Sequence, residues 1–132
     1  MTPGTYNELE ENKSEFRDET NSCQGPILSL KLSDNNVEKY IVTNPIEGYS
    51  ESISLWNDLT FTYEQYTRVG IRFSAGKYTL KDSLLYLHSD PMSFPQMFNR
   101  EKRREKWKHF ILIDKNQVFI KRGKEICFQR DI

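Results

Sequence analysis

The chain of 132 residues carries 19 basic and 19 acidic side chains, so its formal net charge is zero. This length suits a single domain with one core, and the neutral balance argues against a nucleic-acid binder, which is usually basic overall or along one face. The apolar runs are too short to span a bilayer as a helix, so we expect no transmembrane segment.

Residues 1–26 are predicted to be a flexible polar tail or tether in front of the domain. They carry six acidic and two basic side chains, and such a segment cannot offset its ordering entropy by burial. It also lacks the apolar stretch of a signal peptide. The location therefore stays open. If a signal sequence was trimmed, the protein is expected in the periplasm, on the outer membrane through an upstream lipid anchor, or outside the cell. Otherwise it is expected in the cytoplasm.

Residues 27–132 are predicted to form one β-rich domain, because apolar and polar residues alternate through most of it. We expect about eight to ten short strands, at residues 27–32, 37–43, 52–56, 59–64, 69–80, 84–88, 107–113, 118–120 and 126–129. Most connections are of hairpin length, which favours an antiparallel meander closing into a small barrel or half-barrel. A two-sheet sandwich is the alternative. The predicted core consists of Phe61, Val69, Ile71, Phe73, Tyr78, Leu80, Ile111 and Val118.

The longest connection, residues 89–106, interrupts the strand pattern, and its charged part can form a short helix. We expect the basic stretch from Arg100 to Lys108 to be the main contact surface for an unidentified protein partner. It concentrates positive charge in a neutral chain, and aromatic residues flank it. A solvated loop is the alternative. The residues predicted to carry this contact are Arg100, Arg103, Arg104, Lys106 and Trp107.

A second candidate site contains Glu64 and Arg72, which we place on one polar strand face with Thr60, Thr62 and Arg68. If this face points into a barrel, a carboxylate near an arginine can anchor a ligand in a polar lumen. The alternative is that the face is the solvent side of an antiparallel sheet, where polar alternation is expected.

No catalytic or metal site is predicted. His88, Ser89 and Asp90 have the residue types of a hydrolase triad, but adjacent side chains on a strand point to opposite faces. The two histidines, His88 and His109, would need carboxylates or Cys127 to complete a metal site. We therefore expect neither a metal nor another cofactor.

The two cysteines are far apart in the sequence. Cys23 lies where the tail meets the first strand, and Cys127 lies in the last strand. A buried free thiol is the ordinary interpretation of Cys127 in its apolar strand. A disulfide with Cys23 is the alternative if the protein is exported, and the sequence leaves both open.

One family resemblance rests on four segments, residues 53–55, 59–63, 76–80 and 84–90. Their order is a strand, a turn, an aromatic strand, a Gly-Xaa-Tyr strand and an apolar strand. Over about residues 50–90 this order resembles the core of bacterial lipocalin-like lipoproteins. The resemblance implies a lipocalin-like barrel and export, and it transfers no functional residue.

These observations lead to three function hypotheses. The first is a non-enzymatic binding domain of an exported or envelope-associated protein, with a protein or a small apolar ligand as its partner. The second is a small hydrolase-like enzyme that uses Glu64, His88 or His109. The third is a structural envelope protein without a pocket.

Overall fold

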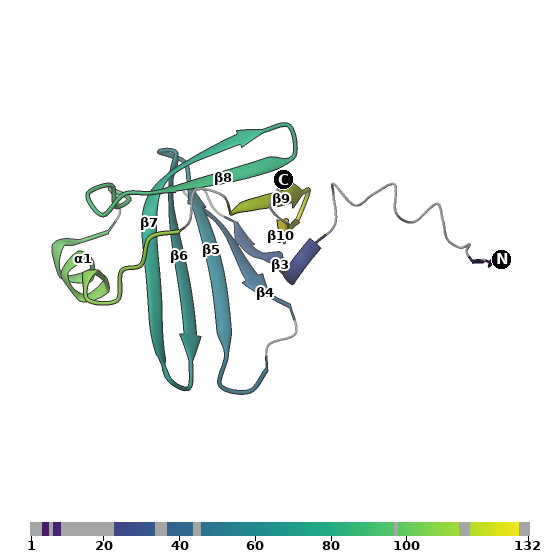
Figure 1. Ribbon diagram of the computed structural model, residues 1–132. Coiled ribbons are helices and arrows are strands. Elements are labelled where there is room, and N and C mark those ends of the chain that lie inside the picture. The colour runs from purple at the N-terminus through teal and green to yellow at the C-terminus, as the bar shows by residue number, and fades with distance from the viewer. Residues whose placement is uncertain are drawn as a thin grey trace.

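The computed structural model describes residues 4–5, 7–8, 23–33, 37–43, 46–96, 98–113 and 117–129. Within them, eight strands form a closed barrel in which each strand is antiparallel to its neighbours (Figure 1). The barrel strands are β3 (Cys23–Ser33), β4 (Val37–Val42), β5 (Ser50–Trp56), β6 (Thr60–Thr67), β7 (Gly70–Lys81), β8 (Leu84–Ser89), β9 (Val118–Arg122) and β10 (Glu125–Gln129). Closure by pairing β10 with β3 removes the exposed sheet edges that a meander would otherwise leave. Two short strands, β1 (Gly4–Thr5) and β2 (Asn7–Glu8), pair separately.

The predicted all-β meander and its closure into a barrel are confirmed, and the alternative two-sheet sandwich is not formed. The boundary of the domain lies earlier than expected. β3 begins at Cys23, so residues 23–26 belong to the barrel and not to the tail. The rest of the predicted tail lies outside the described residues, apart from β1 and β2.

The barrel interior is filled by alternate residues of the strands. The inward side chains are mostly large and apolar, and several are completely buried, among them Tyr40, Ile53, Phe61, Leu85 and Ile126. Cross-strand register explains their meeting. Tyr40 pairs with Ile53, and Leu55 pairs with Phe61, so one face of β4, β5 and β6 points to the axis.

The predicted core is only partly correct. Phe61 is fully buried inside the barrel, and Tyr78 and Ile111 pack partly buried against that core. Phe73 is also fully buried, but it belongs to a second aromatic cluster. The error has a simple cause: two alternating faces of β7 carry apolar residues, and sequence periodicity does not say which of them faces inward.

Three further predicted core residues are exposed. Val69 is 96% exposed in the β6–β7 turn, Ile71 is 38% exposed and Leu80 is 46% exposed. Val118 is buried, with 5% exposure, but it lies on the face of β9 opposite to the core residue Phe119 and does not belong to the barrel core that we predicted for it.

The second cluster lies on the outer face of the barrel, where the segment between β8 and β9 crosses it. Phe73 stacks on Phe94 with ring centroids 5.7 Å apart, and Phe98 and Phe110 complete the contact. In Figure 1 this segment and its helix α1 (Arg100–Trp107) lie beside β6 and β7. The predicted short helix is therefore present. Asn99 caps it, because its side chain accepts a hydrogen bond of 2.7 Å from the backbone N–H of Lys102.

Residues 107–113 are not the strand that we predicted. Trp107 ends α1, and Phe110 forms an isolated parallel bridge with Phe73. The backbone N–H of Phe73 donates to the His109 carbonyl at 2.9 Å, and the N–H of Ile111 donates to the Phe73 carbonyl at 2.7 Å. These bonds pair backbone N–H and carbonyl groups on the edge of β7 that β8 leaves open, since β8 pairs only with Gly76–Lys81.

Gly76 permits the close approach of β7 and β8 at the point where β8 stops pairing with β7 and the following segment takes over. A Cβ atom at Gly76 would lie 2.0 Å from the His88 carbonyl oxygen and 2.8 Å from the Asp90 nitrogen. Only glycine fits such a backbone contact.

Candidate ligand pocket at the barrel mouth

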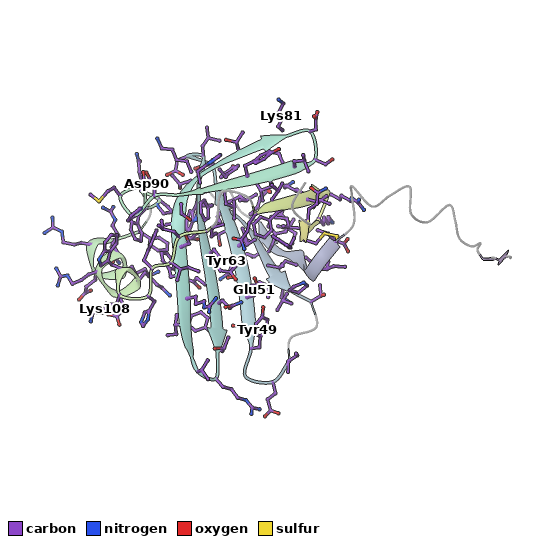
Figure 2. All side chains as sticks on the ribbon, in the orientation of Figure 1. Tyr49, Glu51, Tyr63, Lys81, Asp90 and Lys108 are labelled. Atoms are coloured by element: carbon purple, nitrogen blue, oxygen red, sulfur yellow. A yellow bond between two sulfur atoms is a disulfide. The ribbon has the colours of Figure 1, made fainter. Side chains whose placement is uncertain are left out.

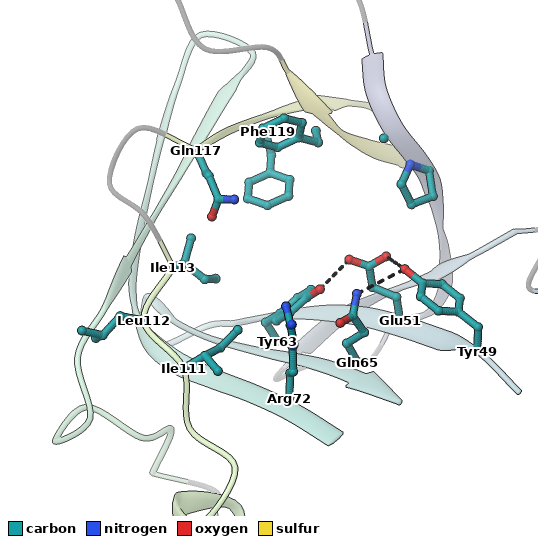
Figure 3. Close-up of a pocket in the computed structure, with 13 residues that line it drawn as sticks. Tyr49, Glu51, Tyr63, Gln65, Arg72, Ile111, Leu112, Ile113, Gln117 and Phe119 are labelled. Atoms are coloured by element: carbon teal, nitrogen blue, oxygen red, sulfur yellow. Dashed lines mark hydrogen bonds between the residues drawn. The ribbon is translucent and has the colours of Figure 1, made fainter. Parts of the chain in front are cut away.

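A pocket of about 430 Å³ lies at the end of the barrel where β3 and β7 begin and β6 and β10 end. This volume is within the range of small-molecule sites. Its lining residues are Gly25, Pro26, Tyr49, Glu51, Tyr63, Gln65, Arg72, Ile111, Leu112, Ile113, Gln117, Phe119 and Phe128. Figure 3 shows Tyr49, Glu51, Tyr63, Gln65 and Arg72 on one side of the pocket, and Ile113 and Phe119 on the other side together with Gln117.

The polar wall is built by β5, β6 and β7. In β5, Glu51 continues the inward face of Ile53 and Leu55, and it pairs with Gln65 of β6. Gln65 in turn pairs with Arg72 of β7. Charged and amide side chains therefore replace apolar ones on the inward face as the strands reach the mouth.

Glu51 is held by two tyrosines from the same wall. The Tyr63 hydroxyl donates a hydrogen bond of 2.7 Å to one carboxylate oxygen, and the Tyr49 hydroxyl donates to the other. The Gln65 amide donates to the Tyr49 hydroxyl at 3.4 Å. Figure 3 shows Tyr49, Glu51 and Tyr63 turned toward one another, and Figure 2 shows where the three lie on the barrel.

The environment of these tyrosines keeps them protonated. Burial raises the pKa of Tyr63 well above its ordinary value, and its hydrogen bond to Glu51 raises it further. Burial and the bond to Glu51 also raise the pKa of Tyr49, although the bond from Gln65 opposes the effect. Both hydroxyls therefore remain hydrogen-bond donors to Glu51 at neutral and moderately alkaline pH.

The opposite wall is apolar. Its main side chains are Ile111 and Ile113 from the segment before β9, Phe119 of β9 and Phe128 of β10. Phe119 and Phe128 pack edge to face, with ring centroids 5.8 Å apart. The segment 111–113 reaches this position because its backbone is bonded to β7 and, through the Ile113 N–H, to the Ser89 hydroxyl at 2.8 Å.

Arg72 lies in this pocket, whereas Glu64 does not. Since Gln65 pairs with Arg72 and Glu64 pairs with Phe73, Arg72 faces inward and Glu64 faces outward. The predicted lumen face that joined Glu64 to Arg72 is therefore wrong. The turn explains the error: Thr67 pairs directly with Gly70, so odd-numbered residues of β6 share a face with even-numbered residues of β7.

Glu64 instead fixes α1 to the barrel. Its carboxylate lies 3.0 Å from the Lys106 ammonium, which also donates to the Tyr66 hydroxyl at 2.7 Å. The same ammonium lies 5.6 Å from the centre of the Phe73 ring. Burial lowers the pKa of Lys106, but the hydrogen bonds to Tyr66 and Glu64 outweigh it, and the net pKa is raised.

The other residues of the predicted partner surface divide into two groups. Arg103 donates a hydrogen bond of 3.0 Å to the Phe98 carbonyl and so helps to hold the helix. Arg100 and Arg104 are exposed. Trp107 is 50% exposed, although its ring packs on Phe110. Lys106 is thus a docking residue, whereas Arg100 and Arg104 carry exposed charges.

The residues of the enzyme hypothesis do not converge. Among the described residues, Glu64 contacts Lys106, and His88 lies on the exposed side of β8 with its Nε2 atom 3.4 Å from the Thr79 hydroxyl. His109 has neither an ion pair nor a side-chain hydrogen bond to either of them within that part of the chain. No group of three or more metal-ligating side chains occurs there either.

Cys23 and Cys127 form a disulfide, with their Cα atoms 5.5 Å apart. It joins the start of β3 to β10 beside the pocket, because Gly25, Pro26 and Phe128 all contribute to the lining. Of the two alternatives that the sequence left open for Cys127, the structure thus shows the disulfide and not the free thiol.

A second set of polar side chains lies at the end of the barrel opposite to the pocket. The Tyr40 hydroxyl donates to Glu38 at 2.9 Å, and the Lys121 ammonium lies 3.9 Å from the same carboxylate. Tyr78 donates to the Trp56 carbonyl at 3.2 Å. These contacts satisfy buried polar atoms where the barrel core ends.

Sequence reasoning missed Tyr49, Glu51 and Gln65, and it placed no pocket residue on segment 111–113. A usable signal was present for Glu51 and Gln65. Each continues, two residues further along, the inward face marked by Ile53 or Tyr63, and a polar residue there indicates the end of a core. The position of segment 111–113 depends on its long-range bonds to Phe73 and Ser89, which leave no local pattern.

No protein-family model matches the chain, and the comparisons with curated proteins and with solved structures found no match either. No helix in the described part is long and apolar enough to cross a membrane. Within the described residues, eight strands form an antiparallel meander barrel, an architecture compatible with a lipocalin-like fold.

Proposed function

We propose that the chain is a non-enzymatic binding domain that holds a small ligand in the pocket at the mouth of its barrel. The observation that carries the proposal is a pocket of about 430 Å³ with one apolar and one polar wall. Apolar walls supply most of the affinity for a small molecule, and a few fixed polar groups orient it. The tyrosine-bound Glu51 is such a fixed group, because its hydrogen bonds are already formed without ligand.

A neutral ligand tests this proposal without assuming anything about charge. Octanol is titrated into the ¹⁵N-labelled protein, and NMR shifts are followed at Ile111, Ile113 and Phe119. Saturable shifts at these residues are expected. Ile113→Trp, which fills the pocket, should abolish them, whereas Leu80→Trp at an exposed site outside the lining should not. Equal binding by both variants would refute the pocket as the binding site.

A second candidate function is partner binding by α1, which the exposed Arg100 and Arg104 and the half-exposed Trp107 favour. The probe is a polyglutamate peptide at low and at physiological salt. Arg100→Glu with Arg104→Glu should weaken binding and its salt dependence while the fold persists, since exposed charges contribute little to stability. Unchanged binding would assign α1 a structural role only.

We also propose that the protein works outside the reducing cytoplasm, in line with its resemblance to bacterial lipocalin-like lipoproteins. The Cys23–Cys127 disulfide supports this location. Thiol labelling of protein taken directly from cells, with and without prior reduction, tests it. Two thiols that react before reduction would contradict the proposal.

A further inference from the structure

One charged side chain of the pocket has no hydrogen-bonding or ion-pair partner in the part of the chain that the structure describes. Arg72 is exposed, and it makes neither a hydrogen bond nor an ion pair with any described residue. It nonetheless lies close enough to Tyr63 to lower that residue's pKa, against the larger raising effect of burial. Figure 3 shows Arg72 beside Tyr63 and Gln65 on the polar wall. Its guanidinium is therefore available to a molecule in the pocket.

Glu51 is the natural internal partner for Arg72, but other donors already hold it. Both of its carboxylate oxygens accept tyrosine hydroxyls, one from Tyr63 and one from Tyr49. The carboxylate keeps further acceptor sites, but the tyrosines fix its position, and it forms no ion pair with Arg72 among the described residues. With Glu51 held in this way, the five N–H groups of Arg72 stay open to a ligand in the pocket.

From this arrangement we infer that the pocket selects an amphipathic carboxylate, an inference that rests on the proposed pocket function. The carboxylate binds Arg72, and the apolar body lies against Ile111, Ile113, Phe119 and Phe128 on the other wall. A carboxylate matches the planar guanidinium in a bidentate manner. The negative charge of Glu51 nearby disfavours a group of higher negative charge, such as a phosphate monoester dianion.

Three ligands of equal chain length test the inference: octanoate, octanol and octylamine. Their dissociation constants are measured by NMR titration at one ionic strength. Octanoate should bind the unmodified protein about tenfold more tightly than octanol, as expected for one charge-assisted bidentate contact. Octylamine should bind more weakly than octanol, because it meets an unpaired arginine.

The variants separate this inference from the proposed function. Arg72→Gln should bring octanoate to the affinity of octanol and leave octanol unchanged. Arg68→Gln is the matched control, since Arg68 is exposed in the β6–β7 turn but does not line the pocket. Equal binding of octanoate and octanol, a preference for octylamine, or equal effects of the two variants would overturn the inference and leave the pocket function standing. If none of the three ligands shifts the lining residues, both fail.

Discussion

Lys106 of α1 and Glu64 of β6 form an ion pair of 3.0 Å on the outer wall of the barrel, and both side chains are about four-fifths buried, with exposed fractions of 20% and 23%. The pair lies over Phe73 and next to Tyr66. A charge that was expected to face a partner therefore holds the helix to its own domain.

Replacement of Lys106 by Met should lower the free energy of unfolding by about 1–2 kcal/mol. The change removes a charge-assisted hydrogen bond and a cation–π contact and leaves Glu64 without its partner. Lys108→Met is the control, because Lys108 is exposed and follows the helix. Denaturant unfolding measures both variants, and equal losses would show that the Lys106 contacts do not stabilise the docking.

Truncation of Phe61 and of Phe73 should each cost about 3–5 kcal/mol, because both side chains are fully buried. The two variants should differ in what they disturb. Phe61→Ala opens a hole in the barrel core, whereas Phe73→Ala loosens the aromatic cluster under α1 and should increase hydrogen exchange in that helix. Val69→Ala should change stability by less than about 0.5 kcal/mol, since Val69 is 96% exposed. A large loss for Val69→Ala would contradict the inward and outward assignment of the β6–β7 hairpin.

Gly76→Ala should destabilise the protein by at least about 3 kcal/mol or prevent its folding, because the added methyl group meets the backbone of His88 and Asp90. Gly70→Ala is a close control in the same strand, with no atom within 4 Å of the added Cβ. Thermal unfolding of the two purified variants is the measurement. Similar melting temperatures would mean that β7 and β8 can separate at the bend without cost.

Reduction of the Cys23–Cys127 disulfide, or its removal by Cys23→Ser with Cys127→Ser, should lower stability by about 3 kcal/mol. The bond closes a loop with a sequence separation of 104, and long closed loops restrict the unfolded chain most. Octanol affinity should also fall, since Pro26 and Phe128 of the pocket lining lie near the bond. Unfolding and titration with and without reductant measure both effects, and unchanged octanol affinity after reduction would show that the pocket wall holds without the bond.

Asp58 should contribute to stability at neutral pH and lose this contribution in acid. Burial raises the pKa of Asp58, but hydrogen bonds from Thr60 and from the Gln96 backbone outweigh it, and the folded-state pKa is lowered. A depressed pKa means that the stabilisation is present above the unfolded-state value and disappears as the pH falls through the folded-state value.

The variant Asp58→Asn checks this sign. It should be less stable than the unmodified protein at pH 7, and the difference should shrink as the pH falls below about 4, the ordinary range of an aspartate. A difference that does not change with pH would assign the effect to geometry and not to charge.

Sequence alternation was sufficient to predict the barrel strands and the meander, because inward positions such as Ile53, Leu55 and Phe61 repeat with a period of two. It also predicted a strand at residues 107–113 that does not form. It failed where both faces of a strand are covered. On β7 the outer residue Phe73 is as deeply buried as an inner one, since α1 and its flanking residues pack on it. The residues that bury Phe73 come from a distant segment, so the local sequence pattern of β7 does not predict its burial.

The candidate site shows the same division. Arg72 was singled out correctly as a polar residue on a strand, but its partner was chosen on the wrong face. The two-residue turn between Thr67 and Gly70 puts Gln65, and not Glu64, on the same face as Arg72. By contrast, the place of Ile111 and Ile113 in the pocket depends on a backbone pairing with β7 and on a serine from β8. Only three-dimensional closure of the barrel brings these residues to Tyr63 and Glu51.

Phe73 has one role on each side of the barrel wall. Its ring belongs to the outer aromatic cluster, and its backbone bonds position Ile111 in the pocket lining. Loop grafting or insertion between β8 and β9 would therefore reshape the cavity as well as the surface. The hairpins that join β7 to β8 and β9 to β10 lie at the opposite end, contribute nothing to the pocket lining and are the better sites for an inserted tag or domain.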